Sequence, residues 1–272
     1  MKYSRKIVST TLITMLLSTS FSFANFDKEA NAISTENANL SFYRYKQICI
    51  NDSFTIGMKE IEENSEFFKA DISYPLLKIK DKYINKEGYN GKIIENINKE
   101  ISAYILNYNE KVKKESEKYK KQYEDILSKS GEDYVKYQYE AYTDYQVTYN
   151  KKNLISIPIK TYNYTGGAHG MSYLKSYNYD LLSGKELKLK DMFKGDVNYK
   201  KVVNSFIKQE IEKKQDIYFS GEEGFKGIED NQEFYIDDDG IVVYFQLYDI
   251  APYYVGIPKF KMTWKEFDKC FK

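Results

Sequence analysis

The stretch from residue 135 to residue 149 alternates between two kinds of side chain. Its odd positions are mostly apolar or aromatic, as in Val135, Tyr137, Tyr139, Ala141, Tyr145, Val147 and Tyr149. Its even positions are mostly polar, as in Lys136, Gln138, Glu140, Asp144, Gln146 and Thr148. A period of two predicts a strand with one buried face. We expect a hairpin turn at residues 150–153 and a second strand that continues the buried face through Ile155, Ile157 and Ile159.

A second periodicity, of three and four residues, predicts two helices. The apolar face of the first is formed by Ile93, Ile94, Ile97, Ile101, Tyr104, Ile105, Tyr108 and Val112. This face thins between Lys111 and Lys121, so we expect the helix to extend into solvent before it ends near Gly131. Its charged end is interpreted as a solvated surface rather than a surface for membranes or anionic wall polymers. The shorter second helix is predicted from Val202, Val203, Phe206, Ile207 and Ile211.

Short apolar segments between polar turns predict the remaining strands. These segments are residues 40–50, 67–79, 171–179, 234–236, 241–247 and 257–262. Pro75 has no backbone N–H, so part of its strand should lie at an edge or a bulge. A short helix carrying Trp264 and Phe267 is expected near the end of the chain. Together the segments predict an α+β fold of two sub-domains, residues 33–164 and 165–272, each with a mixed or antiparallel sheet flanked by amphipathic helices.

The first residues have the features of a secretory signal. The positive charges at the start are Lys2, Arg5 and Lys6. They precede an apolar run, residues 7–23, that ends in small residues, and cleavage fits after Ala24 or after Ala32. The alternative is an uncleaved membrane anchor, although the run is shorter than the ~20 residues of a spanning helix. Residues 1–32 are therefore predicted to be a signal and processing region, and the chain is expected to be secreted or associated with the cell wall.

The net charge of the exported chain is close to zero. Cleavage after Ala24 leaves 38 basic and 40 acidic residues, and cleavage after Ala32 leaves 37 and 38. A nucleic-acid-binding domain is expected to be strongly basic, so a nucleic-acid partner is not expected. With 42% hydrophobic residues, the chain of 272 residues can bury a substantial core.

Cys49 and Cys270 are the only cysteines of the chain. In an oxidising compartment they can form one disulfide, which would stabilise the fold by roughly 0–5 kcal/mol by constraining the unfolded chain. Two free buried thiols are the alternative. A structural zinc site needs four ligands, and two cysteines with a single histidine do not supply them, so no metal or cofactor is expected.

The only histidine lies in a glycine-rich loop between two predicted strands, Thr165-Gly166-Gly167-Ala168-His169-Gly170. The loop lacks the GxGxxG and GxxxxGK[ST] patterns and leads into a strand, so it is not a phosphate-binding loop. It also lacks the serine of a GxSxG nucleophile elbow. The glycines are interpreted as positions that need a positive φ or a close backbone approach, with His169 hydrogen-bonded locally.

Residues 221–239 are strongly acidic. Against the single Lys226 they contain Glu222, Glu223, Glu229, Asp230, Glu233, Asp237, Asp238 and Asp239. The run from Asp237 to Gly240 does not fit an EF-hand, because the twelfth position, which requires a glutamate, is Tyr248. A tight turn between two strands is predicted instead. The excess of acids would attract a strongly basic partner, although each acid taken singly is interpreted as part of a solvated loop.

Four spaced motifs resemble a known extracellular module. They are Tyr164 to Gly170, then Tyr179-Asp180-Leu181 with Gly184-Lys185, then Phe234-Tyr235-Ile236, then Tyr248-Asp249-Ile250-Ala251-Pro252-Tyr253 with Gly256. In this order they resemble the two-part module of RsiV-type anti-sigma factors and PdaC-type peptidoglycan deacetylases, over roughly residues 40–265. The resemblance implies an α+β fold and, from the RsiV-type proteins, a receptor for lysozyme. We find no counterpart of the sigma-binding segment or of the metal-binding histidines of the deacetylase domain, so neither activity is expected.

We therefore expect a binding module that recognises a protein ligand such as a lysozyme-like muramidase, which it senses or inhibits, and that has no catalytic residues. The candidate ligand-binding residues are Gly166, Gly167, His169, Gly170, Tyr248, Asp249, Tyr253 and Tyr254. Ile250 and Pro252, in the same region, are expected in the core. One alternative is a glycan-binding module that uses tyrosines as stacking platforms. Another is a wall-acting hydrolase that pairs His169 with Asp180 or Asp249.

Overall fold

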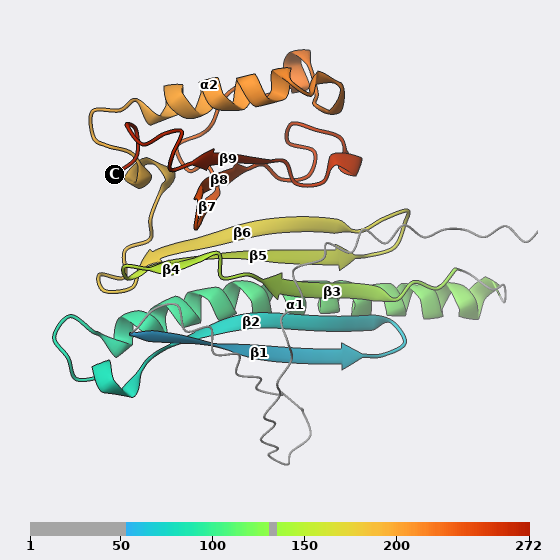
Figure 1. Ribbon diagram of the computed structural model, residues 1–272. Coiled ribbons are helices and arrows are strands. Elements are labelled where there is room, and N and C mark those ends of the chain that lie inside the picture. Colours follow the sequence, from blue (N-terminus) through green and yellow to red (C-terminus); the bar gives the residue numbers. More distant parts are fainter. Residues whose placement is uncertain (1–52, 131–134) are drawn as a thin grey trace, which may run out of the picture.

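The computed structural model describes residues 53–130 and 135–272, which form two sheets and two α-helices (Figure 1). The larger sheet contains β1 (Phe54–Asn64), β2 (Phe68–Ile79), β3 (Tyr139–Tyr145), β4 (Tyr149–Lys151), β5 (Leu154–Tyr164) and β6 (Met171–Asp180). The smaller sheet contains β7 (Phe234–Asp237), β8 (Gly240–Tyr244) and β9 (Lys259–Thr263). The helices are α1 (Gly91–Ser130) and α2 (Tyr199–Glu212). The arrangement confirms the predicted α+β fold.

The larger sheet is mixed, because β2 and β3 pair in parallel while its other pairs are antiparallel. The strand order is β1-β2-β3-β5-β4, and β6 pairs with β5. β3 pairs with β2 only between Phe68 and Ile72, so Pro75 faces a strand on one side alone, as its missing N–H requires. The two-residue turn between β4 and β5 has positive φ at Lys152 and Asn153, which confirms the predicted hairpin.

Helix α1 packs on β2 and β3, because a line of isoleucines faces the larger sheet (Figure 1). Its buried residues are Ile94, Ile97, Ile101, Ile105, Asn109, Val112 and Ser116, at the spacing of one helix face. Asn98 fixes the helix to the strand, since its side chain accepts from Leu77 N and donates to Leu77 O, both at 2.8 Å. No residue of α1 beyond Ser116 is buried, as the thinning apolar face predicted.

The smaller sheet is an antiparallel meander with its own core. The apolar face of α2 contributes Val203 and Ile207, which pack with Ile236, Ile241 and Phe260 of the sheet. In Figure 1 the smaller sheet lies between α2 and β6 of the larger sheet. The second predicted helix and the strands on either side of the Asp237 turn are therefore confirmed.

Several expectations differ from the structure. The alternating segment is a strand only from Tyr139, and Val135 is 65% exposed. The segment that carries Trp264 and Phe267 forms turns rather than a helix. Strand β1 was not predicted, because the glutamates of its second half break the period of two.

The structure also bears on the expected sub-domain division, while several other expectations concern residues that it does not describe. The expected division between residues 164 and 165 falls inside the β5–β6 hairpin, so the larger sheet continues to Asp180. The predicted signal region, the strand at residues 40–50 and Cys49 lie outside the described residues. Within the described ranges, no helix is both long enough and apolar enough to cross a bilayer.

Candidate functional site

The glycine-rich loop joins β5 to β6, whose pairing reaches Asn163 and Met171. Gly166 and Gly167 have φ of 92° and 90°, the left-handed region that favours glycine. Gly170 is buried, and a Cβ there would lie 2.3 Å from Asn163 O. His169 is exposed, and its Nδ1 lies 3.1 Å from Gly170 O. The interpretation of the glycines and of the local histidine contact is therefore confirmed.

A second loop follows β8 and contains the other predicted site residues. Asp249 closes a turn at its start, because its Oδ2 accepts from Gln246 N at 2.7 Å. Tyr248 has φ of 69°, a region that non-glycine residues rarely adopt, yet its side chain is 47% exposed. Tyr254 is 72% exposed, whereas Ile250 is buried as expected and Pro252 is only half-buried. Strained backbone under an exposed aromatic ring is a feature of functional surfaces.

The two loops meet, and the rings of His169, Tyr253 and Tyr248 lie together. The imidazole of His169 stacks on the ring of Tyr253, with centroids 3.9 Å apart and an angle of 22°. The Tyr253 hydroxyl donates to Gly170 O at 2.9 Å, and the ring of Tyr248 lies 5.9 Å from that of Tyr253. We call His169, Tyr248, Tyr253 and Tyr254 the aromatic corner. It combines residues from the two regions that were predicted separately, and His169, Tyr248 and Tyr254 are exposed.

The ring of Tyr162 packs against the glycine-rich loop at Gly170. A Cβ at Gly170 would lie 2.4 Å from the Tyr162 ring and hydroxyl, so this ring lies directly against the loop backbone. Burial raises the pKa of the Tyr162 hydroxyl, and the nearby Glu140 carboxylate adds to the rise. The hydroxyl therefore stays protonated at neutral pH.

Gln246 holds the second loop against β6. Its side-chain amide accepts from Leu174 N at 3.0 Å and donates to Leu174 O at 2.7 Å, so it pairs with the free edge of the strand as a neighbouring strand would. Nearby, Glu233 accepts from the hydroxyl of Tyr244 at 2.7 Å. Burial, followed by this carboxylate, raises the pKa of Tyr244. Sequence reasoning missed Gln246, because a glutamine after a strand carries no signal for a contact with a distant edge.

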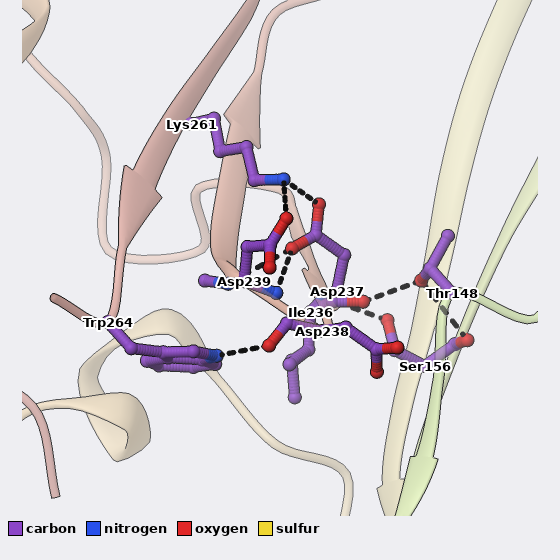
Figure 2. A network of polar contacts seen from close by, with 9 residues as sticks. Thr148, Ser156, Ile236, Asp237, Asp238, Asp239, Lys261 and Trp264 are labelled. Carbon is purple, nitrogen blue, oxygen red and sulfur yellow. Dashed lines mark hydrogen bonds and ion pairs between the residues drawn. The ribbon is translucent and has the colours of Figure 1, made fainter. Parts of the chain in front are cut away.

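A buried polar network joins the two sheets (Figure 2). Ser156 Oγ accepts from Ile236 N at 2.9 Å and lies 2.6 Å from Asn178 Oδ1. Asn178 also donates to Phe234 O at 2.8 Å, and Thr148 Oγ1 donates to Ile236 O at 2.6 Å. Because side chains alternate along β5 and β6, Ser156 and Asn178 lie on the face opposite α1. The network fixes β7 on that face and thereby sets the position of the second loop relative to the first.

The acidic segment divides into two parts. Four of its eight acids form ion pairs: Asp237 and Asp239 with Lys261, Asp238 with Lys151, and Asp230 with Lys200. Figure 2 shows Lys261 between Asp237 and Asp239. The Asp237 carboxylate also accepts from Asp239 N and Gly240 N, which confirms a tight turn. The four glutamates, Glu222, Glu223, Glu229 and Glu233, form no ion pair with any residue in the described ranges.

Neither hydrolytic pairing forms a hydrogen bond between residues that the structure describes. His169 precedes β6 and Asp180 ends it, and the strand between them spans about 30 Å at the rise of an extended strand. Asp180 instead accepts from Leu182 N at 2.9 Å, and Asp249 accepts from Gln246 N. The part of the chain that the structure describes contains no group of three or more histidine, cysteine or acidic side chains suited to a metal ion.

Cys270 is half-buried against the core of the smaller sheet. Its expected partner, Cys49, lies outside the described residues, so the disulfide stays a prediction.

Two known families match separate parts of the chain. The family described as "Deacetylase PdaC" matches residues 61–172, and the family described as "Protein of unknown function (DUF3298)" matches residues 190–265. The peptidoglycan-N-acetylmuramic acid deacetylase PdaC of Bacillus subtilis is 32% identical over 121 residues, which are 43% of this chain and 26% of that protein. The chain thus spans about a quarter of the length of this relative.

The fold also has a counterpart among crystal structures. A member of the DUF3298 family from Bacteroides fragilis superposes with a TM-score of 0.57 at 25% identity, over 80% of this chain and 94% of the other. The PdaC match includes His169, and the DUF3298 match includes Tyr248, Tyr253 and Tyr254, so the aromatic corner forms where the two regions meet. The resemblance predicted from the motifs is confirmed: residues 61–172 are similar to the PdaC family, and residues 190–265 are similar to the DUF3298 family.

Proposed function

We propose that this chain is an exported module that binds a protein ligand at the cell wall through the aromatic corner and catalyses no reaction. The carrying observation is the contact of two distant loops, which stacks His169 on Tyr253 beside the exposed ring of Tyr248. The next residue of the second loop, Tyr254, is also exposed. Tyrosine rings supply a large contact area at a small cost in conformational entropy, and tyrosines are frequent in binding hot spots. The link to the wall is supported by the name of the Bacillus subtilis relative, a peptidoglycan deacetylase.

The ligand that we propose is a basic, lysozyme-like muramidase. The motif resemblance supports this class, and so does the charge beside the corner. Glu229, Glu233 and Asp249 form no ion pair within the described ranges, so their field is left to attract a positively charged surface. The N-terminal sequence supports export by the secretory route, with the signal removed after Ala24 or Ala32.

A capture experiment tests the proposal. The exported chain is immobilised and exposed to lysozyme at low and at moderate salt, with cytochrome c as an equally basic protein that is not a muramidase. We expect capture of lysozyme alone, weakened by salt because charge contributes to the attraction. Capture of both proteins to the same extent would reduce the interaction to unspecific charge attraction and contradict the proposal.

Variants of the exposed tyrosines locate the surface. Tyr254→Ala should weaken lysozyme capture about tenfold or more, in the range of a binding hot spot. The matched control is Tyr173→Ala, since Tyr173 is 41% exposed but pairs with Thr161 on the sheet face that α1 covers. Equal loss in both variants would reject the corner as the binding surface.

Two further outcomes would replace the proposal. Retention on purified peptidoglycan without lysozyme capture would favour a glycan-binding module that uses the same rings. Release of sugar, acetate or peptide from wall fragments, abolished by His169→Ala, would show an enzyme.

A further inference from the structure

A hollow of about 420 Å³ lies beside the aromatic corner, on the side of Asp249. Its walls come from residues 224–233 and from the start of the second loop, two segments that the fold of the smaller sheet brings together. Phe245 and Ile250 are buried at its floor, and the ring of Phe225 stands edge-on to Phe245 at 5.5 Å. Part of the lining is therefore apolar and aromatic.

Three acidic residues line the same hollow. They are Glu229, Glu233 and Asp249, which come from different turns of the chain. Two of them are held in place by protein donors, Glu233 Oε2 by the Tyr244 hydroxyl and by Ser176 N, and Asp249 Oδ2 by Gln246 N. These bonds use one oxygen each, so Glu233 Oε1 and Asp249 Oδ1 accept no hydrogen bond from the described residues.

The lysine in the lining forms no ion pair with these groups. Lys226 also lines the hollow, but its Nζ donates to Gly221 O at 2.6 Å, a carbonyl of its own loop. No ion pair in the described ranges involves Glu229, Glu233 or Asp249. The acids farther along the segment, by contrast, are paired with Lys261, Lys151 and Lys200. The hollow thus combines unpaired acidic residues with aromatic residues in its lining.

We propose that this hollow receives an arginine side chain of the protein ligand. The aliphatic part of the side chain and the flat guanidinium pack on the aromatic floor, and the N–H groups of the guanidinium donate to the carboxylates. Arginine fits better than lysine, because it has five donors in one plane and stacks on aromatic rings, whereas the lysine ammonium is a small and strongly hydrated point charge. The inference rests on the proposed function, since it assumes a protein ligand.

The test uses a small probe, so that it does not depend on any muramidase. N-acetyl-L-arginine methylamide is titrated into the exported chain at low salt, and binding is followed by NMR shifts of backbone amides. We expect shifts at Phe225, Glu229 and Asp249, and none with the matching citrulline compound, which has a similar shape without the charge. Equal shifts with citrulline, or equally strong shifts with the lysine compound, would overturn the proposal.

Variants give the second readout. Glu229→Gln combined with Asp249→Asn replaces two exposed carboxylates by amides of the same shape, and we expect the arginine shifts to fall at least fivefold. The control is Asp238→Asn, an exposed acid that is paired with Lys151 away from the hollow. Unchanged shifts in the double variant would overturn the proposal.

The two proposals fail in different ways. Lysozyme capture that is undiminished in the Glu229→Gln/Asp249→Asn variant would reject the hollow while keeping the proposed function. Arginine shifts at the hollow without lysozyme capture would reject the muramidase while keeping the hollow as an arginine site.

Discussion

The hydroxyl of Tyr253 donates to the carbonyl oxygen of Gly170 at 2.9 Å, although the two residues are 83 positions apart in the sequence. This bond joins the glycine-rich loop to the loop that follows β8. Tyr253→Phe removes the bond but keeps the ring on His169, so we expect a loss in the free energy of unfolding of about 1 kcal/mol. Tyr253→Ala also removes the stack and should weaken ligand capture much further. Equal capture by the two variants and the native chain would show that the contact has no part in binding.

Gly170 should not tolerate even a methyl group. In Gly170→Ala the new Cβ meets a backbone oxygen at 2.3 Å and the Tyr162 ring at 2.4 Å, so the loop must move. We expect a loss of roughly 2–3 kcal/mol in thermal or urea unfolding. Gly195→Ala is the control, because no atom lies within 4 Å of its Cβ position. A Gly170→Ala chain as stable as the Gly195→Ala chain would contradict this close approach.

Tyr248 should show opposite effects on stability and on binding. Asparagine tolerates a positive φ better than tyrosine does, so Tyr248→Asn should leave the free energy of unfolding unchanged or raise it by up to about 1 kcal/mol. Ligand capture should fall about tenfold, because the exposed ring is lost. Tyr173→Asn, in a strand, should lower stability and leave capture intact. The prediction is wrong if Tyr248→Asn is clearly destabilised while its capture of the ligand persists.

Ser156 should contribute more to the free energy of unfolding than the small size of its side chain indicates. Ser156→Ala leaves Ile236 N and Asn178 Oδ1 without their partner in a buried interface, which should cost roughly 2–3 kcal/mol in urea unfolding. Thr143→Val is the control within the same sheet, because the buried Thr143 hydroxyl has no hydrogen-bond partner and valine has the same shape. We expect that control to be neutral or stabilising. Similar losses in both would argue against the network as the link between the sheets.

Asp191 should make stability depend on pH. Burial tends to raise the pKa of its carboxyl, but donation from Lys188 N and from the Lys185 ammonium outweighs burial and holds the pKa below the usual 3.8. An acid with a lowered pKa stabilises the fold above its unfolded-state pKa, and this contribution disappears as the pH falls through the folded-state pKa. Asp191→Asn should therefore cost about 1 kcal/mol at pH 7, and the difference from the native chain should shrink below about pH 4. A difference that stays constant from pH 7 to pH 2.5 would show that ionisation is not involved.

Local patterns were sufficient for most elements and for the individual parts of the corner. The period of three and four residues predicted α1 and α2, and Asn150 to Asn153 predicted the hairpin turn. The same patterns failed where polar side chains interrupt a strand, as in β1, and where tertiary contacts hold a turn, as in the segment that contains Trp264. The sequence shows residues 221–239 as one acidic segment. The lysines that pair with four of its eight acids come from distant elements, so the sequence alone does not reveal them.

The sequence by itself determined the two-part organisation, the glycines that need unusual backbone and the tyrosines available for binding, because these depend on residues a few positions apart. Only the tertiary structure decided that His169 stacks on Tyr253, that Gln246 closes the edge of β6 and that Glu229 and Asp249 share one hollow. Such contacts join residues far apart in the chain, and they depend on how Ser156 and Asn178 fix the smaller sheet on the larger one. That orientation results from the packing of the whole chain, and no local pattern encodes it.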